Sequence, residues 1–344
     1  MTQQAGEDSH RTVNLALQGG GAHGAFAWGV LDRLLEEERL AFEGISATSA
    51  GAMNAAVLAY GMAAGGRAEA RRSLEKFWRL IAEAAAFSPL QPSPIDRMLG
   101  NHGLDFSPAF LAFELGTRML SPYQFNPCNI NPLRSVLEEV VDFALVRRQC
   151  PLKLFFSATN VRTGKVRIFE NPEITADAVL ASACLPFLFQ AVEIDGEAYW
   201  DGGYMGNPAI FPLIYGCESR DVVIVHINPL ERPGVPRTAE EIMNRLNEIS
   251  FNSSLMREMR AIAFVTRLID EGEIQGSRMK RMLIHGILSD AVTKNLPAMS
   301  KMNADWGFLT HLRELGREHA AAWLEASFAR LGRDSTVDVR ALYL

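Results

Sequence analysis

The sequence predicts an α/β fold, and three observations carry that prediction. Two strand–turn–helix units follow one another at residues 13–34 and 44–62. The runs 152–157 and 221–226 are dense in β-branched and aromatic residues, as in strands that helices cover on both faces. With 344 residues, 48% of them hydrophobic and 22% charged, the chain is long enough for one large α/β unit or two domains.

The first two units place their turns at the carboxyl ends of strands. Residues 13–18 alternate apolar and polar side chains, residues 19–24 form a glycine-rich loop, and residues 26–34 repeat apolar side chains at helical spacing. A short strand at 44–48 then runs through Ser49-Ala50-Gly51 into an alanine-rich helix at 52–62. Open α/β sheets bind their ligands at this edge, so both turns are candidate sites.

The middle of the chain mixes helices, loops and antiparallel strands. Residues 66–85 predict an amphipathic helix, and the proline-rich and asparagine-rich stretches 87–94 and 121–132 predict surface loops. Asn131-Pro132 opens a helix predicted at 133–143, because proline is favourable in a first helical turn. The Asp195-Gly196 pair predicts a tight hairpin turn, which, with a strand at 165–169, makes the sheet mixed.

Three prolines between residues 229 and 236 mark a boundary. We therefore expect a main domain at 12–236 and a mainly helical extension at 237–344 that packs on it. The elements predicted in the extension are helices at 238–271 and 312–331, the latter with Gly316 inside it, and a strand at 282–287.

Charge, cysteine content and targeting signals exclude several classes. The 34 basic and 40 acidic residues give a net charge of −6, which argues against a nucleic-acid partner. The four cysteines contain no C-x-x-C pair, so we expect no zinc site and no disulfide framework. Residues 1–11 lack the features of a secretory signal, and residues 50–65 are too short to span a bilayer. We expect a cytoplasmic protein whose contact with a membrane or lipid surface is peripheral.

Ser49 is the candidate nucleophile. It lies between strand and helix with small neighbours on both sides, as a nucleophile elbow requires. The helix that follows directs backbone N–H groups and a positive dipole end at any negative charge that forms nearby. The alternative is a serine that only caps the helix.

The triple glycine Gly19-Gly20-Gly21 permits backbone N–H groups to converge on an anion, as in an oxyanion hole. A tight strand-to-helix connection is the alternative. Gly19, Gly21 and Gly24 also spell G-x-G-x-x-G, the nucleotide-binding fingerprint. That fingerprint expects an acid at the end of the second strand, whereas Glu43 lies near the start of that strand.

Asp201 opens an Asp-Gly-Gly turn after a short strand and is the candidate general base for Ser49, with a simple turn aspartate as the alternative. A Ser–Asp–His triad would use His226 or His285, but both lie inside predicted strands, which favours buried structural histidines. His23, in the glycine loop, either positions substrate or closes the loop.

Four blocks in order resemble the patatin-like phospholipases: Gln18 to Gly24, Ala47 to Gly51, Ala181 to Pro186, and Asp201 to Gly203. The resemblance covers about residues 13–228. It implies a three-layer α/β/α hydrolase with a mixed central sheet, and the remaining chain is similar to the helical extension of a bacterial subgroup. Nucleotide-binding and catalytically silent lipid-binding proteins are the alternatives from other classes.

The resemblance also implies the chemistry: Ser49 attacks a lipid acyl ester and Asp201 is its sole base, without metal or cofactor. The block at 181–186 would shape the wall of an acyl pocket. The residues that correspond to the family's oxyanion hole are Gly19, Gly20, Gly21 and Ala22. This chain departs from the family pattern in having Ala47 before the serine turn and His23, instead of arginine, after the glycines.

Two further stretches carry expectations about lipid. Arg278, Lys280 and Arg281 form a small basic cluster, which is either a solvated face or a contact for anionic headgroups. The segment from Phe87 to Phe125 is expected to form a lid over the site.

Overall fold

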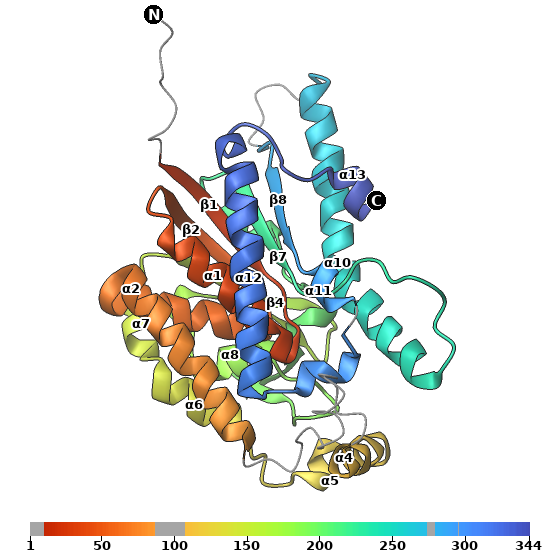
Figure 1. Ribbon diagram of the computed structural model, residues 1–344. Helices are drawn as coiled ribbons and strands as arrows, with labels where there is room; N and C mark the ends of the chain where they lie inside the picture. The colour runs from red at the N-terminus through yellow and green to blue at the C-terminus, as the bar shows by residue number, and fades with distance from the viewer. Residues whose placement is uncertain (1–9, 87–106, 274–278, 295) are drawn as a thin grey trace, which may run out of the picture.

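The computed structural model describes residues 10–86, 107–273, 279–294 and 296–344. A sheet runs through the centre of the molecule, with helices on both of its faces (Figure 1). This arrangement confirms the predicted three-layer α/β/α fold and its mixed sheet. The strands are β1 (Arg11–Leu17), β2 (Leu40–Ala47), β3 (Lys153–Asn160), β4 (Val166–Glu170), β5 (Val192–Ile194), β6 (Glu197–Asp201), β7 (Asp221–His226) and β8 (Leu283–Leu288).

The strand order is β5-β6-β3-β2-β1-β7-β8, with β4 paired to β3. Strands β3, β2, β1, β7 and β8 are parallel neighbours, so their carboxyl ends meet at one edge. Strands β4, β5 and β6 form the antiparallel part, and Asp195 and Gly196 make the predicted hairpin turn with positive φ angles of 52° and 78°.

The helices connect and cover these strands. Short 3-10 turns occur at η1 (Gly21–His23), η2 (Asn171–Glu173), η3 (Gly202–Tyr204), η4 (Ala298–Met302) and η5 (Phe328–Arg330). The α-helices are α1 (Gly24–Glu36), α2 (Ala50–Ala86), α4 (Pro108–Met119), α5 (Pro122–Phe125), α6 (Pro132–Val140), α7 (Phe143–Gln149), α8 (Ala176–Ser182), α9 (Phe211–Gly216), α10 (Ala239–Asp270), α11 (Asp290–Thr293), α12 (Trp306–Ser327) and α13 (Val339–Tyr343).

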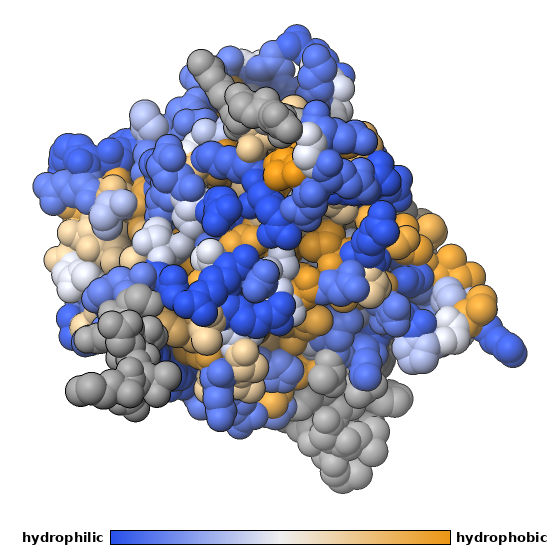
Figure 2. Space-filling model, turned by 90° about the horizontal axis from the view of Figure 1, so that it is seen from above, coloured by the Kyte–Doolittle hydropathy of each residue, from blue (hydrophilic) through white to orange (hydrophobic). Residues whose placement is uncertain are grey.

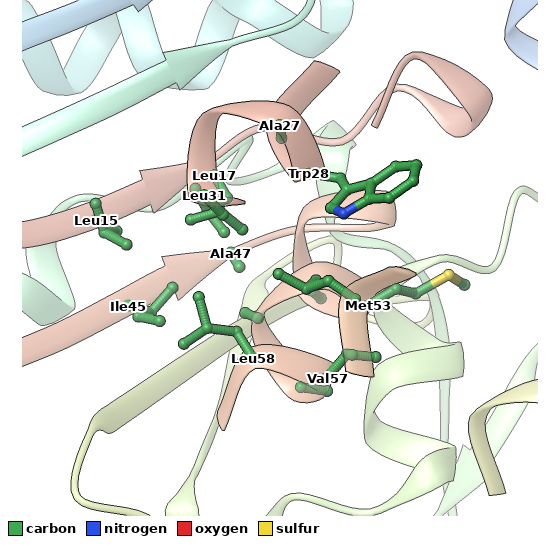
Figure 3. Packing of buried hydrophobic residues seen from close by; sticks show 14 of the residues in the cluster. Leu15, Leu17, Ala27, Trp28, Leu31, Ile45, Ala47, Met53, Val57 and Leu58 are labelled. Atoms are coloured by element: carbon green, nitrogen blue, oxygen red, sulfur yellow. The ribbon is translucent and has the colours of Figure 1, made fainter. Parts of the chain in front are cut away.

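The two-residue period of the strands divides the core between the two faces. Leu15 and Leu17 of β1 belong to the larger core cluster, with α1, α2, α8 and α12, while Ala16 belongs to the cluster formed with α9, α10 and α13. Figure 3 shows Leu15 and Leu17 of β1, with Ile45 and Ala47 of β2, facing the side chains of α1 and the first part of α2.

Three predicted boundaries differ from the structure, two of them because a side chain caps a helix start. The predicted helix at 133–143 is two helices, because Val141 is extended and the Asp142 side chain caps a new start by accepting from Leu145 N. The predicted loop at 121–132 contains α5. Helix α12 begins earlier than predicted, at Trp306, because Asp305 caps its first turn by accepting from Phe308 N.

The helices predicted at 52–62 and 66–85 form the two arms of α2. They meet at a kink where Gly65 and Gly66 leave the helical region, and Gly66 has a φ of +74°. A residue with a side chain is rarely found in that conformation, which explains the glycine there.

The predicted extension contributes to the sheet and to a helical layer. Strand β8 pairs in parallel with β7, and α12 lies along α1 (Figure 1). A β-carbon at Gly29 would lie 1.9 Å from Arg313 O, and one at Gly316 would lie 2.1 Å from Phe26 O. The two helices therefore touch backbone to backbone. The division into domains at residue 236 stays a prediction.

The face of the molecule seen in Figure 2 is mainly hydrophilic. Seen from above, from the end at which β1 begins, hydrophilic side chains spread over most of the face with smaller hydrophobic areas between them (Figure 2). Over the described ranges, no helix combines the length and the hydropathy needed to cross a membrane.

We predict that Gly316→Ala destabilises the protein. The added methyl group meets the Phe26 carbonyl, and overpacking of this kind costs about 1–3 kcal/mol, more than the roughly 1 kcal/mol that alanine gains over glycine in a helix. Gly116→Ala is the matched control, since a β-carbon at Gly116 of α4 has no neighbour within 4 Å. Urea unfolding of both variants tests this; equal stabilisation by the two substitutions would contradict it.

Candidate active site

Ser49 occupies a sharp turn between β2 and α2. Its φ of +55° is unusual for a residue with a side chain and is typical of a nucleophile elbow. Hydrogen bonds of the preceding residue, Thr48, hold the turn in place. Thr48 N donates to Leu17 O at 3.2 Å. Thr48 Oγ1 contacts Ser157 Oγ at 2.5 Å and donates to Gly206 O at 2.6 Å. A strained residue persists only where its surroundings hold it in this way.

The small neighbours of Ser49 allow close backbone packing. A β-carbon at Gly51 would lie 2.5 Å from Leu17 O, so this position requires glycine. Ala47, where the family pattern has glycine, is fully buried in the core. Ser49 N donates to Ser182 Oγ at 2.9 Å, which links the serine turn to the block at 181–186.

Asp201 ends β6 and is fully buried. Its N–H donates to Cys184 O at 2.8 Å, and its carbonyl accepts from Thr159 Oγ1 at 2.8 Å, so the backbone is held on both sides. Oδ1 accepts from Gly203 N at 2.7 Å, which caps the turn η3. Oδ2 makes no hydrogen bond of standard geometry with any described residue.

Burial raises the pKa of Asp201 from 3.8 to about 7. The Gly203 N–H and, to a smaller extent, the Ser49 hydroxyl act in the opposite direction and lower the pKa by stabilising the carboxylate. The hydroxyl is therefore close enough to the carboxyl to affect its ionisation. A carboxyl with a pKa near neutrality is suited to accept a proton at neutral pH.

The glycine loop lies directly against Ser49. A β-carbon at Gly19 would lie 2.5 Å from Ser49 Cβ and 3.3 Å from Ser49 Oγ, so only a bare backbone fits there. The Gly19 N–H is already used, because it donates to Asn207 Oδ1 at 2.7 Å. Within the part of the chain that the structure describes, no hydrogen bond occupies the N–H groups of Gly20 and Gly21.

Buried amides hold this loop in place. Gln18 Oε1 accepts from Ile227 N at 2.9 Å and Asn228 N at 3.0 Å, and Asn228 Nδ2 donates to Gly19 O at 2.7 Å. The segment after β7 therefore fixes the loop after β1. Gly21 has a φ of +58°, which favours glycine at that position.

A largely apolar cavity of about 350 Å³ opens beside Ser49, a volume within the usual range of small-molecule sites. Ala183 and Leu185, from the block at 181–186, are part of its wall, as the resemblance implied. The described residues contain no group of three side chains arranged to hold a metal ion. The lining residues are Gly21, Ala22, Ser49, Ala50, Met53, Phe77, Trp78, Ile81, Ala84, Ala85, Pro132, Leu133, Val136, Ala183, Leu185, Leu188, Phe189, Lys301, Met302 and Ala304.

Two histidines have structural partners elsewhere. His226 Nε2 contacts Tyr343 Oη at 2.5 Å, and burial lowers the pKa of His226 to about 3. His285 Nε2 contacts Asp221 Oδ1 at 2.9 Å, at the opposite edge of the sheet from the serine turn. This agrees with the interpretation of both as buried structural histidines.

His23 contacts the predicted extension and does not line the cavity. Its Nε2 lies 2.7 Å from Ser300 Oγ, and its ring meets Phe308 edge to face. Burial, with Lys301 and Arg232 adding to it, lowers the pKa of His23 well below 6.5, so the ring is neutral. This geometry favours loop closure over substrate positioning.

The carboxylate of Glu43, the acid considered for nucleotide binding, lies near the edge at which the parallel strands begin, opposite the edge with the glycine loop. It binds Lys153 Nζ at 2.9 Å and accepts from Glu218 N and Ser219 N at 2.8 Å each. These partners stand where β3 and β7 begin, whereas the glycine loop follows the end of β1.

The remaining predicted features lie farther from Ser49 or partly outside the described residues. Lys280 donates to Cys217 O, and Arg281 forms an ion pair with Asp270 at 2.7 Å, while Arg278 is outside the described residues. Of the expected lid, residues 87–106 are also outside the described residues, and the rest contains α4 and α5. The lid stays a prediction.

Sequence reasoning did not find Asn207, Asn228 and Lys301. Asn207 and Asn228 bind the glycine loop from about 190 and 210 positions away, and Lys301 lines the cavity from the predicted extension. An asparagine or a lysine without a neighbouring motif gives no local signal, so only the folded chain reveals these contacts.

A doubly covered α/β sheet with a strained serine elbow and a glycine loop at its carboxyl edge is typical of serine hydrolases. Residues 15–214 match the model of a family described as Patatin-like phospholipase. The match covers more than half of the chain. The protein belongs to this family and is, in general terms, a lipid acyl hydrolase.

Solved structures match this chain at low sequence identity and with TM-scores below 0.5. VipD from Legionella pneumophila is 14% identical with a TM-score of 0.43, over 95% of this chain and 72% of that chain. A chain of the ExoU–SpcU complex of the type III secretion system of Pseudomonas aeruginosa is 16% identical with a TM-score of 0.39, over 94% of this chain and 52% of that one. This chain thus spans about half of that neighbour. No curated protein matches in sequence.

We predict that Asp201→Asn stabilises the protein more at pH 8 than at pH 5. Because the pKa of folded Asp201 is about 7 and its ordinary value is 3.8, the folded state binds the extra proton, and stability falls as pH rises towards 7. Asparagine removes this loss, which reaches about 3 kcal/mol between pH 5 and pH 8. Urea unfolding of both proteins at both pH values measures it; a pH-independent difference would contradict it.

Proposed function

We propose that the protein hydrolyses acyl esters of lipids, as a phospholipase A or lysophospholipase does, through a Ser49–Asp201 dyad. The observation that carries the proposal is the fully buried carboxyl of Asp201, whose Oδ2 makes no hydrogen bond of standard geometry with any described residue, together with a strained Ser49 that lies directly against the bare glycine loop. Burial raises the pKa of Asp201 to about 7, and the Ser49 hydroxyl lowers it to a smaller extent. The free Oδ2 is the atom that would accept the proton.

In the first half-reaction, Ser49 Oγ attacks the ester carbonyl carbon while Asp201 Oδ2 takes the hydroxyl proton. The carbonyl oxygen becomes an oxyanion, and the N–H groups of Gly20, Gly21 and Ala22 stabilise it with the amino end of α2. Gly19 orients the loop instead, because its N–H binds Asn207. The ester bond then breaks, and the leaving alcohol takes the proton from Asp201.

In the second half-reaction, water attacks the acyl-serine ester and gives a proton to Asp201. The bond between the acyl carbon and Ser49 Oγ breaks, Ser49 recovers its proton, and the fatty acid leaves. The apolar wall of the cavity, including Phe77, Met53 and Leu188, supports an acyl chain as the bound group. No other side chain has to move a proton in this scheme.

We predict that a fluorophosphonate probe labels Ser49 once per chain in the wild-type protein. Ser49→Ala is expected to abolish labelling and the release of fatty acid, and Asp201→Asn to reduce both by about 10²-fold or more, because the hydroxyl loses its base. Peptide mass spectrometry locates the adduct. Labelling that persists in Ser49→Ala would overturn the assignment, and wild-type protein that binds lipid without labelling would favour the catalytically silent alternative.

We also predict an acid limb in the pH dependence of kcat/KM for p-nitrophenyl butyrate, with a midpoint near pH 7. Asp201 must be ionised to act, so the rate falls about tenfold per pH unit below this midpoint. His226 does not titrate in this range, since its pKa is about 3.

Glu258→Gln is the matched control for this profile. Burial also raises the pKa of Glu258 to about 7, but its carboxylate accepts from Ile210 N and Phe211 N, away from the serine turn. This variant is expected to keep the acid limb. Loss of the limb in Glu258→Gln would contradict the assignment to Asp201.

A further inference from the structure

The turn η4 of the predicted extension is part of the substrate cavity. A β-carbon at Gly21 would lie 2.4 Å from Lys301 O, so η4 packs directly on the glycine loop. His23 Nε2 and Ser300 Oγ add a contact at 2.7 Å. The backbone of η4 is therefore fixed against the loop, and Lys301 is one of the residues that line the cavity.

Lys301 is the one residue with a charged side chain among the described residues that line the cavity. Its ammonium group donates to Asn228 Oδ1 at 2.8 Å, and the amide oxygen of asparagine carries no charge. Of the carboxylates in the described ranges, none lies within 4.0 Å of Lys301 Nζ. The ammonium group of this cavity-lining residue thus has no carboxylate partner within ion-pair distance among the described residues.

The surrounding charges increase the demand for an anion. Glu248, the carboxylate that acts on Lys301 from farther away, is held by Arg232 at 2.7 Å and Arg245 at 3.1 Å. Two arginines thus hold this carboxylate by direct ion pairs that Lys301 does not make, and His23 is neutral. Burial, with a contribution from Arg232, lowers the pKa of Lys301 to about 8, so the group is still mainly protonated at pH 7.

We propose that Lys301 is a specificity-determining residue that binds a negatively charged group next to the scissile ester of the substrate. The proposal rests on the hydrolase function proposed above. The apolar wall takes the acyl chain, Ser49 meets the ester carbonyl, and Lys301 Nζ donates to a phosphate oxygen of the same molecule. A neutral acyl ester cannot make this contact, so the ammonium group stays without an anionic partner.

The Asn228 side chain joins this cation to the catalytic loop. It accepts from Lys301 Nζ with Oδ1 and donates to Gly19 O with Nδ2, at 2.8 and 2.7 Å. Asn228 is therefore the single residue between the ammonium group that would bind the anion and the loop that would bind the oxyanion. A test therefore has to distinguish the loss of the Lys301 charge from a displacement of the glycine loop.

Lys301→Gln suits this test, because glutamine keeps an N–H donor for Asn228 but carries no charge. The quantity to measure is kcat/KM for two monomeric substrates, dihexanoylphosphatidylglycerol and dihexanoylglycerol. The ratio between the anionic and neutral esters is expected to fall about tenfold or more in Lys301→Gln, and Lys301→Arg is expected to keep it. Should Lys301→Gln not fold, Lys301→Met removes the same charge.

Lys294→Gln is the matched control, since it removes a charge from an exposed lysine that does not line the cavity. It is expected to retain the wild-type ratio. An unchanged ratio in Lys301→Gln overturns the proposal. An equal loss with both esters also overturns it, because it indicates that Lys301 only supports the glycine loop.

Binding provides a readout that does not depend on turnover. In the Ser49→Ala background, titration calorimetry is expected to show that adding Lys301→Gln weakens binding of dihexanoylphosphatidylglycerol about tenfold. Equal affinities with and without this substitution overturn the assignment of Lys301. Wild-type protein that cleaves neither ester contradicts the proposed function instead, and the titration still tests Lys301.

Discussion

The burial of one ionisable carboxyl against one hydroxyl is the constraint on which the rest of the site depends. Asp201 ends β6, which pairs with β3, and caps the turn η3, and burial raises its pKa from 3.8 to about 7. The same burial that makes the carboxyl basic near neutral pH destabilises the fold whenever the group is ionised. The fold tolerates this cost because the backbone of Asp201 is bonded on both sides.

Close backbone approach is the second requirement, and it explains the glycines near the site. Gly19 packs on Ser49, Gly51 on the end of β1, and Gly202 on Ser157 of β3, each at distances that exclude a β-carbon. These contacts hold the turns after β1 and β2 against each other and the turn after β6 against β3. Polar side chains then replace the bonds that irregular backbone lacks, as Asn207 and Asn228 do for Gly19.

The predicted extension is built into this arrangement. Strand β8 continues the parallel sheet, α12 packs on α1 without side chains between them at Gly29 and Gly316, and η4 closes on the glycine loop. The cavity wall therefore combines residues from η1, α2, α6, the segment 183–189 after α8, and η4. A substrate bound there would contact parts of the chain that lie about 280 positions apart.

The sequence by itself determined the α/β class, the strand-to-helix turns and the residue types of the site, because alternation, glycine and tight turns are local properties. Ser49 and Asp201 became candidates in this way, since each follows a strand and opens a small-residue turn. Only the tertiary structure decided that the Gly19 N–H is already bonded and which charged residue lines the cavity. Those facts depend on Asn207 and Lys301, whose partners are distant in the chain, and hydrogen bonding and burial act through space rather than along the sequence.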